Sequence, residues 1–275
     1  REIFNQYKQI IIDECHVVNS KGGQYEYFLS NVQGLVCVGL TATPYRLKSS
    51  GNTSVIEFLT RIRPAFFKKV IHVTQQSELL EAGFLSPIQY KRRHEINLKN
   101  VVVKGNEYEE NSLMREYRRV RVEDLIIQEI EILEKERKSV LVFTEFIDNL
   151  QCIRAKRPDI HAVTGATPTD ERADILERFK TGQIQTLINV GVLTTGFDYP
   201  ALDSIIVAKA TKSLSLWYQI IGRGQRIAEG KNDCLVVDMC GNLGVLGDVQ
   251  KLEVLELNGK WIVKQGQRII TNKAF

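Results

Sequence analysis

Residues 9–16 read QIIIDECH, and this stretch decides the fold. Its three consecutive isoleucines are typical of a strand that is buried on both faces of a parallel sheet. Two adjacent carboxylates, Asp13 and Glu14, follow that strand directly. Open α/β sheets bind ligands at the carboxyl ends of their strands, so one acid could hold Mg²⁺ through water while its neighbour orients or deprotonates an attacking water. The alternative is a strand that ends in an ordinary polar turn.

The overall composition narrows the class of protein. A chain of 275 residues is comfortable for two domains, and 43% hydrophobic with 25% charged residues is typical of a globular protein. The net charge of +4 is compatible with a nucleic-acid partner without indicating one. No apolar run approaches the roughly 20 residues of a membrane span, and no signal peptide is visible.

The cysteines and the first residue indicate the context of the chain. Five cysteines without a CxxC pair, and four scattered histidines, do not form a zinc motif. An odd number of thiols favours a reducing cytoplasm. The chain opens with Arg1 rather than Met and soon reaches a buried-strand pattern. We therefore expect a fragment of a longer protein.

Residues 35–46, LVCVGLTATPYR, contain a second short buried-strand pattern, which ends at Thr41 and Thr43. Pro44 stops the strand because it has no amide to donate to a ladder. A DECH tetrad followed by a strand that ends in TAT resembles motifs II and III of superfamily 2 helicases.

The next stretch predicts short elements. Strands are expected at residues 70–73 and 87–90, and a short helix at 77–82. The helicase resemblance implies that residues 83–92, GFLSPIQYKR, hold the last strand of the first motor domain. The three cations at 91–93 indicate a solvated rim, with a phosphate-facing patch as the alternative.

A connector at residues 97–111 and one long helix at 112–138 are expected to follow, because apolar residues recur in the latter at helical spacing. The first half of this helix carries REYRRVR, residues 115–121. Basic residues beside an aromatic ring can grip a nucleic-acid backbone and stack on a base, so Tyr117 is a candidate contact. We favour the alternative, an exposed linker helix.

Strand patterns alternate with helix patterns from residue 139 onward, which predicts a right-handed parallel sheet. Thr167 is expected to cap a helix with Pro168 at its first helical position and Gly182 at its end. The expected strands cover residues 140–143, 160–163, 186–190, 204–207 and 233–237, and a further helix is expected at 144–157.

Residues 191–200 (GVLTTGFDYP) and 216–226 (LWYQIIGRGQR) match motifs V and VI of superfamily 2, TGxD and QxxGRxxR. With motifs II and III, four motifs stand in the correct order. The chain therefore resembles DECH-box helicases of superfamily 2 over residues 7–248; it is most similar to RadD-like helicases and next to the motor subunits of restriction enzymes. The resemblance implies an α/β fold with two RecA-like parallel-sheet domains, the first of them incomplete.

The dipeptide Asn258-Gly259 predicts a β-hairpin near the carboxyl end, since this pair is preferred in two-residue turns. We expect the hairpin to cap a domain, with a nucleic-acid contact as the alternative. The implied domains are the carboxyl-terminal half of the first RecA-like domain (1–95), a connector and linker helix (96–138), the second RecA-like domain (139–248) and the hairpin extension (249–275).

The resemblance also implies the cofactors, ATP and Mg²⁺, and a role for each motif position. Asp13 would hold the Mg²⁺ through water, and Glu14 would position the attacking water. Arg223 and Arg226 would reach across the nucleotide cleft as fingers, and Gln219, Gly222 and both arginines are expected on one face of a helix. The other implied residues are His16, Gly196, Asp198 and Gln219 for the nucleotide, His16, Thr41 and Thr43 for coupling, and Thr144, Thr164, Gly165 and Thr194 for nucleic acid.

One departure from the family is serious. The sequence contains no GxxxxGK[ST], the P-loop that supplies a backbone cradle and a lysine for the β and γ phosphates. In the family this loop lies upstream of DECH, so we expect that it has been cut away and that this chain alone is inactive. The intact protein is expected to be a nucleic-acid-dependent ATPase, a DNA helicase or translocase of repair or restriction, with single-strand-binding, repair or restriction proteins as partners. An RNA helicase, and a helicase-like binding module without catalysis, are the alternatives.

Overall fold

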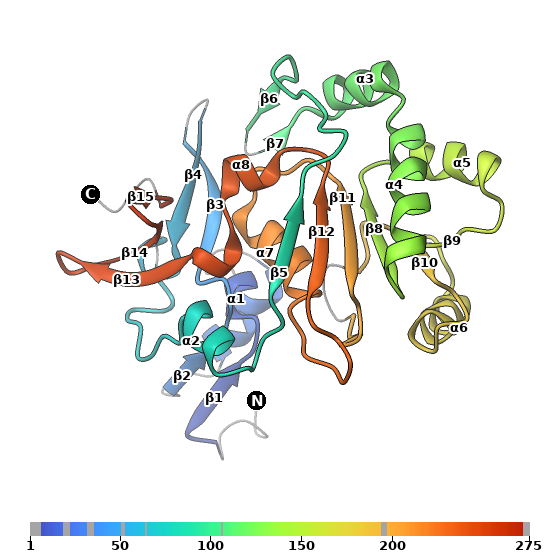
Figure 1. The fold of residues 1–275 in the computed structure, drawn as a ribbon. Coiled ribbons are helices and arrows are strands. Elements are labelled where there is room, and N and C mark those ends of the chain that lie inside the picture. The colour runs from blue at the N-terminus through green and yellow to red at the C-terminus, as the bar shows by residue number, and fades with distance from the viewer. Residues whose placement is uncertain are drawn as a thin grey trace. The chain divides into compact units, whose positions relative to one another are not determined.

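The computed structural model describes residues 7–18, 23–31, 36–50, 53–63, 65–105, 107–193 and 197–271. The chain divides into two compact units, each containing parallel strands (Figure 1). The first unit joins Arg1–Val73 to Glu253–Phe275, and the second unit is Thr74–Leu252.

The first unit contains a parallel pair of strands and two antiparallel ribbons. The parallel pair is β1 (Gln9–Ile12) with β2 (Val36–Gly39), so both strands predicted around DECH and TAT are confirmed. The remaining elements are η2 Cys15–Val17, α1 Gly23–Asn31, β3 Tyr45–Ser50 paired with β4 Thr53–Phe58, η3 Leu59–Arg61, and the ribbon of β13 Glu253–Leu257, β14 Lys260–Gln265 and β15 Arg268–Ile269.

Strand β1 is buried on one face only, and the predicted burial on both faces is wrong. Ile12 packs in a small cluster with Leu59, whereas the Ile11 side chain is 63% exposed. Successive side chains of a strand point to opposite faces. Among the described residues, only the face that carries Ile12 is covered by apolar neighbours.

The predicted carboxyl-terminal hairpin is confirmed. Strands β13 and β14 pair antiparallel, and both turn residues, Asn258 and Gly259, have positive φ angles of 50° and 72°. This is the conformation for which Asn-Gly is selected. The Trp261 ring stacks on Phe58 of β4 at a centroid distance of 6.3 Å, so the hairpin packs within the first unit.

The second unit is a parallel sheet with helices, as predicted for a RecA-like domain. Its six strands are in the order β5-β12-β11-β8-β10-β9, all paired parallel (Figure 1). The strands are β5 Ile88–Lys91, β8 Val140–Thr144, β9 His161–Thr164, β10 Thr186–Val190, β11 Ser204–Ala208 and β12 Cys234–Asp238, beside a small ribbon of β6 Val103–Lys104 and β7 Glu107–Tyr108. The helices are α2 Gln76–Glu81, α3 Glu110–Val120, α4 Val122–Glu136, α5 Ile147–Lys156, α6 Thr169–Lys180, α7 Leu214–Gly222, α8 Asn242–Leu246 and η4 Val249–Lys251.

The predicted single helix at 112–138 is wrong, because the chain forms α3 and α4 with a break at Arg121. Arg121 has φ 54°, and its amide donates to the last carbonyls of α3. Tyr117 and Val122 are both fully buried. Residues five apart lie about 140° apart around a straight helix, so one helix could not place both side chains against the same sheet. The turn at Arg121 allows it.

Two further predictions about the first half of the chain are wrong. Strand β5 was expected to close the first domain, but it pairs with β12 and begins the second unit's sheet, which moves the domain boundary from residue 95 to Thr74. An isolated apolar run does not specify which sheet it joins. Residues 70–73 form no strand, and Ile71 is exposed there.

No helix among the residues described by the structure has both the length and the apolar character that crossing a membrane requires.

Candidate functional site

The two carboxylates of DECH lie in a tight turn at the carboxyl end of β1. The Oδ1 atom of Asp13 accepts the backbone amide of Glu14 at 2.8 Å. Glu14 itself has a left-handed backbone, with φ 48° and ψ 42°. This conformation is unfavourable for a residue with a Cβ and is often found at functional sites. Both acids remain exposed.

His16 connects this turn to motif III. Its Nδ1 atom lies 3.2 Å from Glu14 Oε2 and 3.0 Å from Thr41 Oγ1. The Thr43 amide donates to the same Thr41 hydroxyl at 2.9 Å. Burial lowers the pKa of His16, against the opposing effect of the Glu14 carboxylate. The predicted coupling residues are therefore brought together, and their functional role stays a prediction.

Arg46 is a member of this cluster that the sequence did not identify. Its guanidinium donates through Nε to the carbonyl of His16 and through Nη2 to that of Val18. Burial lowers the pKa of Arg46. A fixed, half-buried cation thus satisfies carbonyl groups of the η2 turn. Its position at the end of TATPYR was the only available signal.

Glycine at position 39 permits close approach of β2 to the DECH turn. A Cβ atom there would lie 2.6 Å from the Cys15 Sγ atom and 2.6 Å from the Phe67 ring. Real Cβ atoms do not approach that closely, so any larger side chain would push β2 from η2. The tight packing of motif II against motif III depends on this residue.

Motif V is divided between the two edges of the second unit's sheet. At the carboxyl edge, the buried Asn189 of β10 accepts the amides of Val192 and Leu193, which fixes the turn after the strand. Thr194 and Gly196 lie outside the described residues, so their predicted roles have no structural account. Asp198 precedes β11, at the amino edge of the sheet, and forms an ion pair with Arg226.

Motif VI does not form one continuous helical face, and that prediction is wrong for Arg226. Helix α7, which contains the half-buried Gln219, ends at Gly222, and Arg226 lies in irregular chain three residues beyond Arg223. The backbone amides of residues 223–225 donate to carbonyls three residues back instead of four, which ends the α-helix. Gly224 then lies against Cys234 at the start of β12, because a Cβ there would be 2.5 Å from the Cys234 Sγ atom.

Both arginines of motif VI contact the segment that carries motif V. The Nη1 atom of Arg223 donates to the carbonyl of Phe197 at 2.6 Å, and Arg226 pairs with the neighbouring Asp198. The ion pair is solvent-accessible, with side chains 39% and 65% exposed. The structure therefore places Asp198, Arg223 and Arg226 together at the amino edge of the sheet, and their predicted roles at the nucleotide stay predictions.

The predicted nucleic-acid residues lie at the opposite, carboxyl edge. Thr144 ends β8 with its side chain 1% exposed, so a direct contact from that side chain is contradicted. Thr164 and Gly165 follow β9, and a Cβ at Gly165 would meet no atom of the described chain. Thr167 bonds the Thr164 amide at 2.9 Å instead of capping α6, which begins at Thr169.

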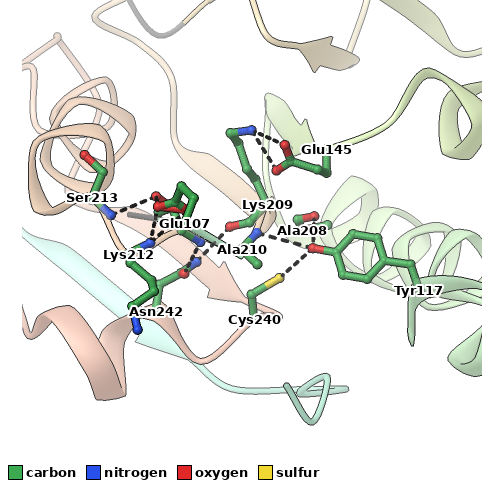
Figure 2. Close-up of polar contacts among 11 residues, drawn as sticks. Glu107, Tyr117, Glu145, Ala208, Lys209, Ala210, Lys212, Ser213, Cys240 and Asn242 are labelled. Atoms are coloured by element: carbon green, nitrogen blue, oxygen red, sulfur yellow. Dashed lines mark hydrogen bonds and ion pairs between the residues drawn. The ribbon is translucent and has the colours of Figure 1, made fainter. Parts of the chain in front are cut away.

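The REYRRVR stretch is a linker and not a stacking platform. The Tyr117 ring is fully buried, and its hydroxyl donates to the Ala208 carbonyl at 3.0 Å and lies 3.2 Å from Cys240 Sγ (Figure 2). A base cannot stack on it there. Arg118, Arg119 and Arg121 form ion pairs with Asp148, Glu116 and Asp124 respectively.

The segment 208–213, which leads into α7, is held by residues that sequence reasoning missed. Glu107 accepts the Lys212 amide and the Thr211 hydroxyl, and Asn242 accepts the Thr211 amide at 3.0 Å (Figure 2). Burial raises the pKa of Glu107, and its hydrogen bonds from Lys212 and Thr211 oppose that effect. Lys209 pairs with Glu145 at 2.7 Å. None of these partners is near its counterpart in sequence.

Comparison with known proteins agrees with this arrangement. Residues 121–228 match the family model of the helicase conserved C-terminal domain. A Saccharomyces cerevisiae protein whose name describes it as an ATP-dependent helicase, IRC3, is 27% identical over 247 residues, which cover 86% of this chain and 34% of that protein. The chain is similar to superfamily 2 helicases and carries the helicase conserved C-terminal domain over residues 121–228.

A second relative is similar to this chain over a shorter stretch. A Schizosaccharomyces pombe protein named as a mitochondrial ATP-dependent helicase, irc3, is 36% identical over 111 residues, covering 39% of this chain and 18% of that protein. The chain thus spans about a third of the length of the first relative and less of the second.

Solved structures share the fold of this chain. A fragment described as an HsdR subunit of a type I restriction enzyme from Vibrio vulnificus YJ016 aligns with a TM-score of 0.65 at 21% identity, covering 88% of this chain and 45% of that one. The restriction-modification enzyme LlaBIII bound to DNA gives 0.57 at 16% identity, covering 86% and 18%. Saccharomyces cerevisiae Dbp5 bound to RNA gives 0.54 at 14% identity, covering 89% and 56%. At these identities the likeness shows the fold alone.

Proposed function

We propose that this superfamily 2 chain is part of a nucleic-acid-dependent ATPase that acts as a DNA helicase or translocase. The observation that carries the proposal is the contact chain from Glu14 through His16 to Thr41 in the first unit. A water-positioning carboxylate is thereby linked to the strand end that carries motif III. Movement of either group changes the hydrogen bonds of His16, and this is the kind of link that coupling hydrolysis to nucleic acid requires.

The chemistry proposed for the first unit is attack of water on the γ-phosphate of ATP. Glu14 is exposed and can hold a water by its carboxylate, while the left-handed turn fixes its backbone conformation. Asp13 fits an Mg²⁺ role because it is exposed and offers hard carboxylate oxygen, with Oδ1 occupied by the Glu14 amide. Mg²⁺, when bound, would neutralise charge on the phosphate oxygens.

The second unit is proposed to supply positive charge to the phosphates through Arg223 and Arg226. Arginine fingers of nucleotide hydrolases contribute about 10³ to 10⁵ in rate where they have been measured. The ion pair of Arg226 with Asp198 is exposed, and such pairs are weak, so a phosphate can replace the carboxylate at little cost. Asp198 would then pair with Arg226 only while no phosphate is bound.

Nucleic acid is proposed to contact the carboxyl edge of the second unit's sheet, at Thr164 and Gly165. Gly165 is exposed and lets a phosphate backbone approach the main chain closely. We favour DNA, in repair or restriction, because the wording of motifs II, III, V and VI is most similar to RadD-like helicases and next to the motor subunits of restriction enzymes. Single-strand-binding, repair or restriction proteins are the proposed partners, and the cytoplasm is the proposed compartment.

Nucleic-acid-stimulated ATP hydrolysis by the full-length native protein tests the proposal. Single-stranded DNA should raise turnover at least tenfold more than RNA of the same length, and Glu14→Gln should abolish turnover while leaving DNA affinity unchanged. Stimulation by RNA alone would identify an RNA helicase. DNA binding without any turnover would identify a binding module. That alternative is suggested by the missing GxxxxGK[ST].

A further inference from the structure

Lys231 binds the backbone of motif V to that of motif VI. Its Nζ atom donates to the carbonyls of Pro200 at 3.0 Å, Gly224 at 2.8 Å and Arg226 at 2.8 Å. An ammonium group has three N–H donors, and three carbonyl acceptors lie at hydrogen-bond distance here. Pro200 closes the GVLTTGFDYP stretch, whereas Gly224 and Arg226 belong to the GRGQR stretch.

This lysine differs from a solvated surface lysine. Burial lowers the pKa of Lys231, with Cys234, Asp203 and Asp233 acting in the opposite direction. Within the described ranges, no carboxylate lies at ion-pair distance from its Nζ atom. The cation is therefore stabilised mainly by the dipoles of three carbonyl groups that converge on it, and those groups become fixed relative to one another.

The neighbours of Arg226 are anchored independently. Gly224 lies against Cys234 at the start of β12, as its missing side chain permits. Gln225 is buried; its side chain donates to Gln76 Oε1 at 2.8 Å, and its carbonyl accepts the Ser86 amide at 2.7 Å. Arg226 lies outside α7, so no helical hydrogen bond orients it. Its carbonyl is held by Lys231.

We propose that Lys231 is a positioning residue, which clamps the main chain of Arg226 to that of Pro200 and so places the Arg226 guanidinium for transition-state contact. The inference rests on the proposed ATPase function. Catalytic groups tolerate little displacement: about 1 Å of misplacement can cost on the order of 10²-fold in rate. A group that acts in the transition state changes kcat, and leaves KM nearly unchanged.

The test compares three variants of the full-length native protein. Lys231→Met keeps the length of the side chain but removes every donor. Lys231→Arg keeps the charge, but its planar fork cannot aim three N–H groups at carbonyls converging on one nitrogen, so rescue should be partial. Lys135→Met, at an exposed lysine in the last turn of α4, is the matched control.

Two measurements separate the clamp from its catalytic consequence. Hydrogen exchange, followed by mass spectrometry in peptides covering residues 223–230, should be faster in Lys231→Met and unchanged in Lys135→Met. Steady-state ATP hydrolysis at saturating DNA should show kcat reduced about 10- to 100-fold, with KM for ATP within about threefold of the parent. Lys231→Arg should give intermediate values of exchange and kcat. Melting temperatures are recorded for each variant.

Each possible outcome either supports or overturns the proposed role of Lys231. Faster exchange at 223–230 with a loss confined to kcat supports the proposal. Unchanged exchange overturns the clamp, and faster exchange with unchanged kcat overturns its catalytic role. A lower melting temperature with parallel losses of kcat and DNA affinity would identify a structural lysine; if Lys231→Met does not fold, the same criteria apply to Lys231→Arg. A parent protein that hydrolyses no ATP refutes the proposed function and the catalytic role together, while exchange still reports on the clamp.

Discussion

Replacement of Arg226 by alanine distinguishes a catalytic arginine from a structural one by the size of its effects on kcat and on the melting temperature. Arg226 is bound to Asp198 in an ion pair whose side chains are 39% and 65% exposed. Exposed pairs contribute ~0–1 kcal/mol to stability. For a domain of this size class, ~1 kcal/mol corresponds to about 2–4 °C in melting temperature. If Arg226 is purely structural, its truncation to alanine should therefore lower the melting temperature by only a few degrees.

The catalytic expectation is much larger. A finger worth about 10³ to 10⁵ in rate corresponds to ~4–7 kcal/mol of transition-state stabilisation. Arg226→Ala in the full-length native protein should therefore reduce kcat by at least three orders of magnitude, with DNA affinity unchanged and a melting temperature within about 4 °C of the parent. Arg226→Lys should rescue poorly, because lysine lacks the planar fork that binds phosphate oxygens bidentately.

Arg178→Ala is the matched control for this experiment. Arg178 forms a similarly exposed ion pair with Asp174, with side chains 37% and 65% exposed, and it lies outside the predicted motifs, so kcat should stay within a few-fold of the parent. Steady-state ATPase rates with saturating DNA and a melting curve for each variant are the measurements. If Arg226→Ala melts normally and turns over within a few-fold of the parent, Arg226 is not a finger and the assignment of motif VI is wrong.

Three other outcomes are expected. The 275-residue chain alone should not bind ATP tightly, because its sequence offers no GxxxxGK[ST] cradle; micromolar binding in a calorimetric titration would contradict this. Hydrogen exchange should be faster in β1 and β2 than in residues 139–248, since Ile11 and Val36 are exposed in a two-stranded pair, and equal protection would show that the pair is stabilised in another way. Stability should depend on the protonation of His16: its folded pKa is below the ordinary 6.5, so its contribution is present above pH 6.5 and is lost as pH falls through the folded pKa. Melting curves should show this acid-side loss reduced in His16→Gln, with a residual part from His161, whose pKa is also lowered; an unchanged pH profile would remove His16 as the cause.

The elements that the sequence predicted best are those whose information is local. The run at 186–190 is apolar and bounded by polar turns, and β10 occupies the same residues. Likewise, Asn-Gly at 258–259 specifies its own turn by backbone preference. In each case the residues that determine the structure lie within the predicted segment.

The errors concern choices between distant partners. The sequence of strand β5 suits either sheet, and its pairing with β12 is visible only in the structure. Gly224, just beyond the end of helix α7, lies against Cys234, and the helical spacing of apolar residues does not predict this contact. The contacts of Lys231 could not be predicted from the sequence, because its acceptors are backbone carbonyls, which every residue possesses. Side-chain pattern carries no signal for such bonds.

Helix α7 gives the second unit a rigid route between the two edges of its sheet. At its start, the Ser213 amide donates to the Thr211 hydroxyl, which in turn donates to Glu107. Its nine residues span about 13 Å, and its middle is fixed by the buried Trp217, whose Nε1 donates to the Gly247 carbonyl. At its end, Arg223 donates to Phe197. These hydrogen bonds at the start, the middle and the end therefore fix the orientation of the helix that leads to Arg223 and Arg226 at the opposite edge of the sheet.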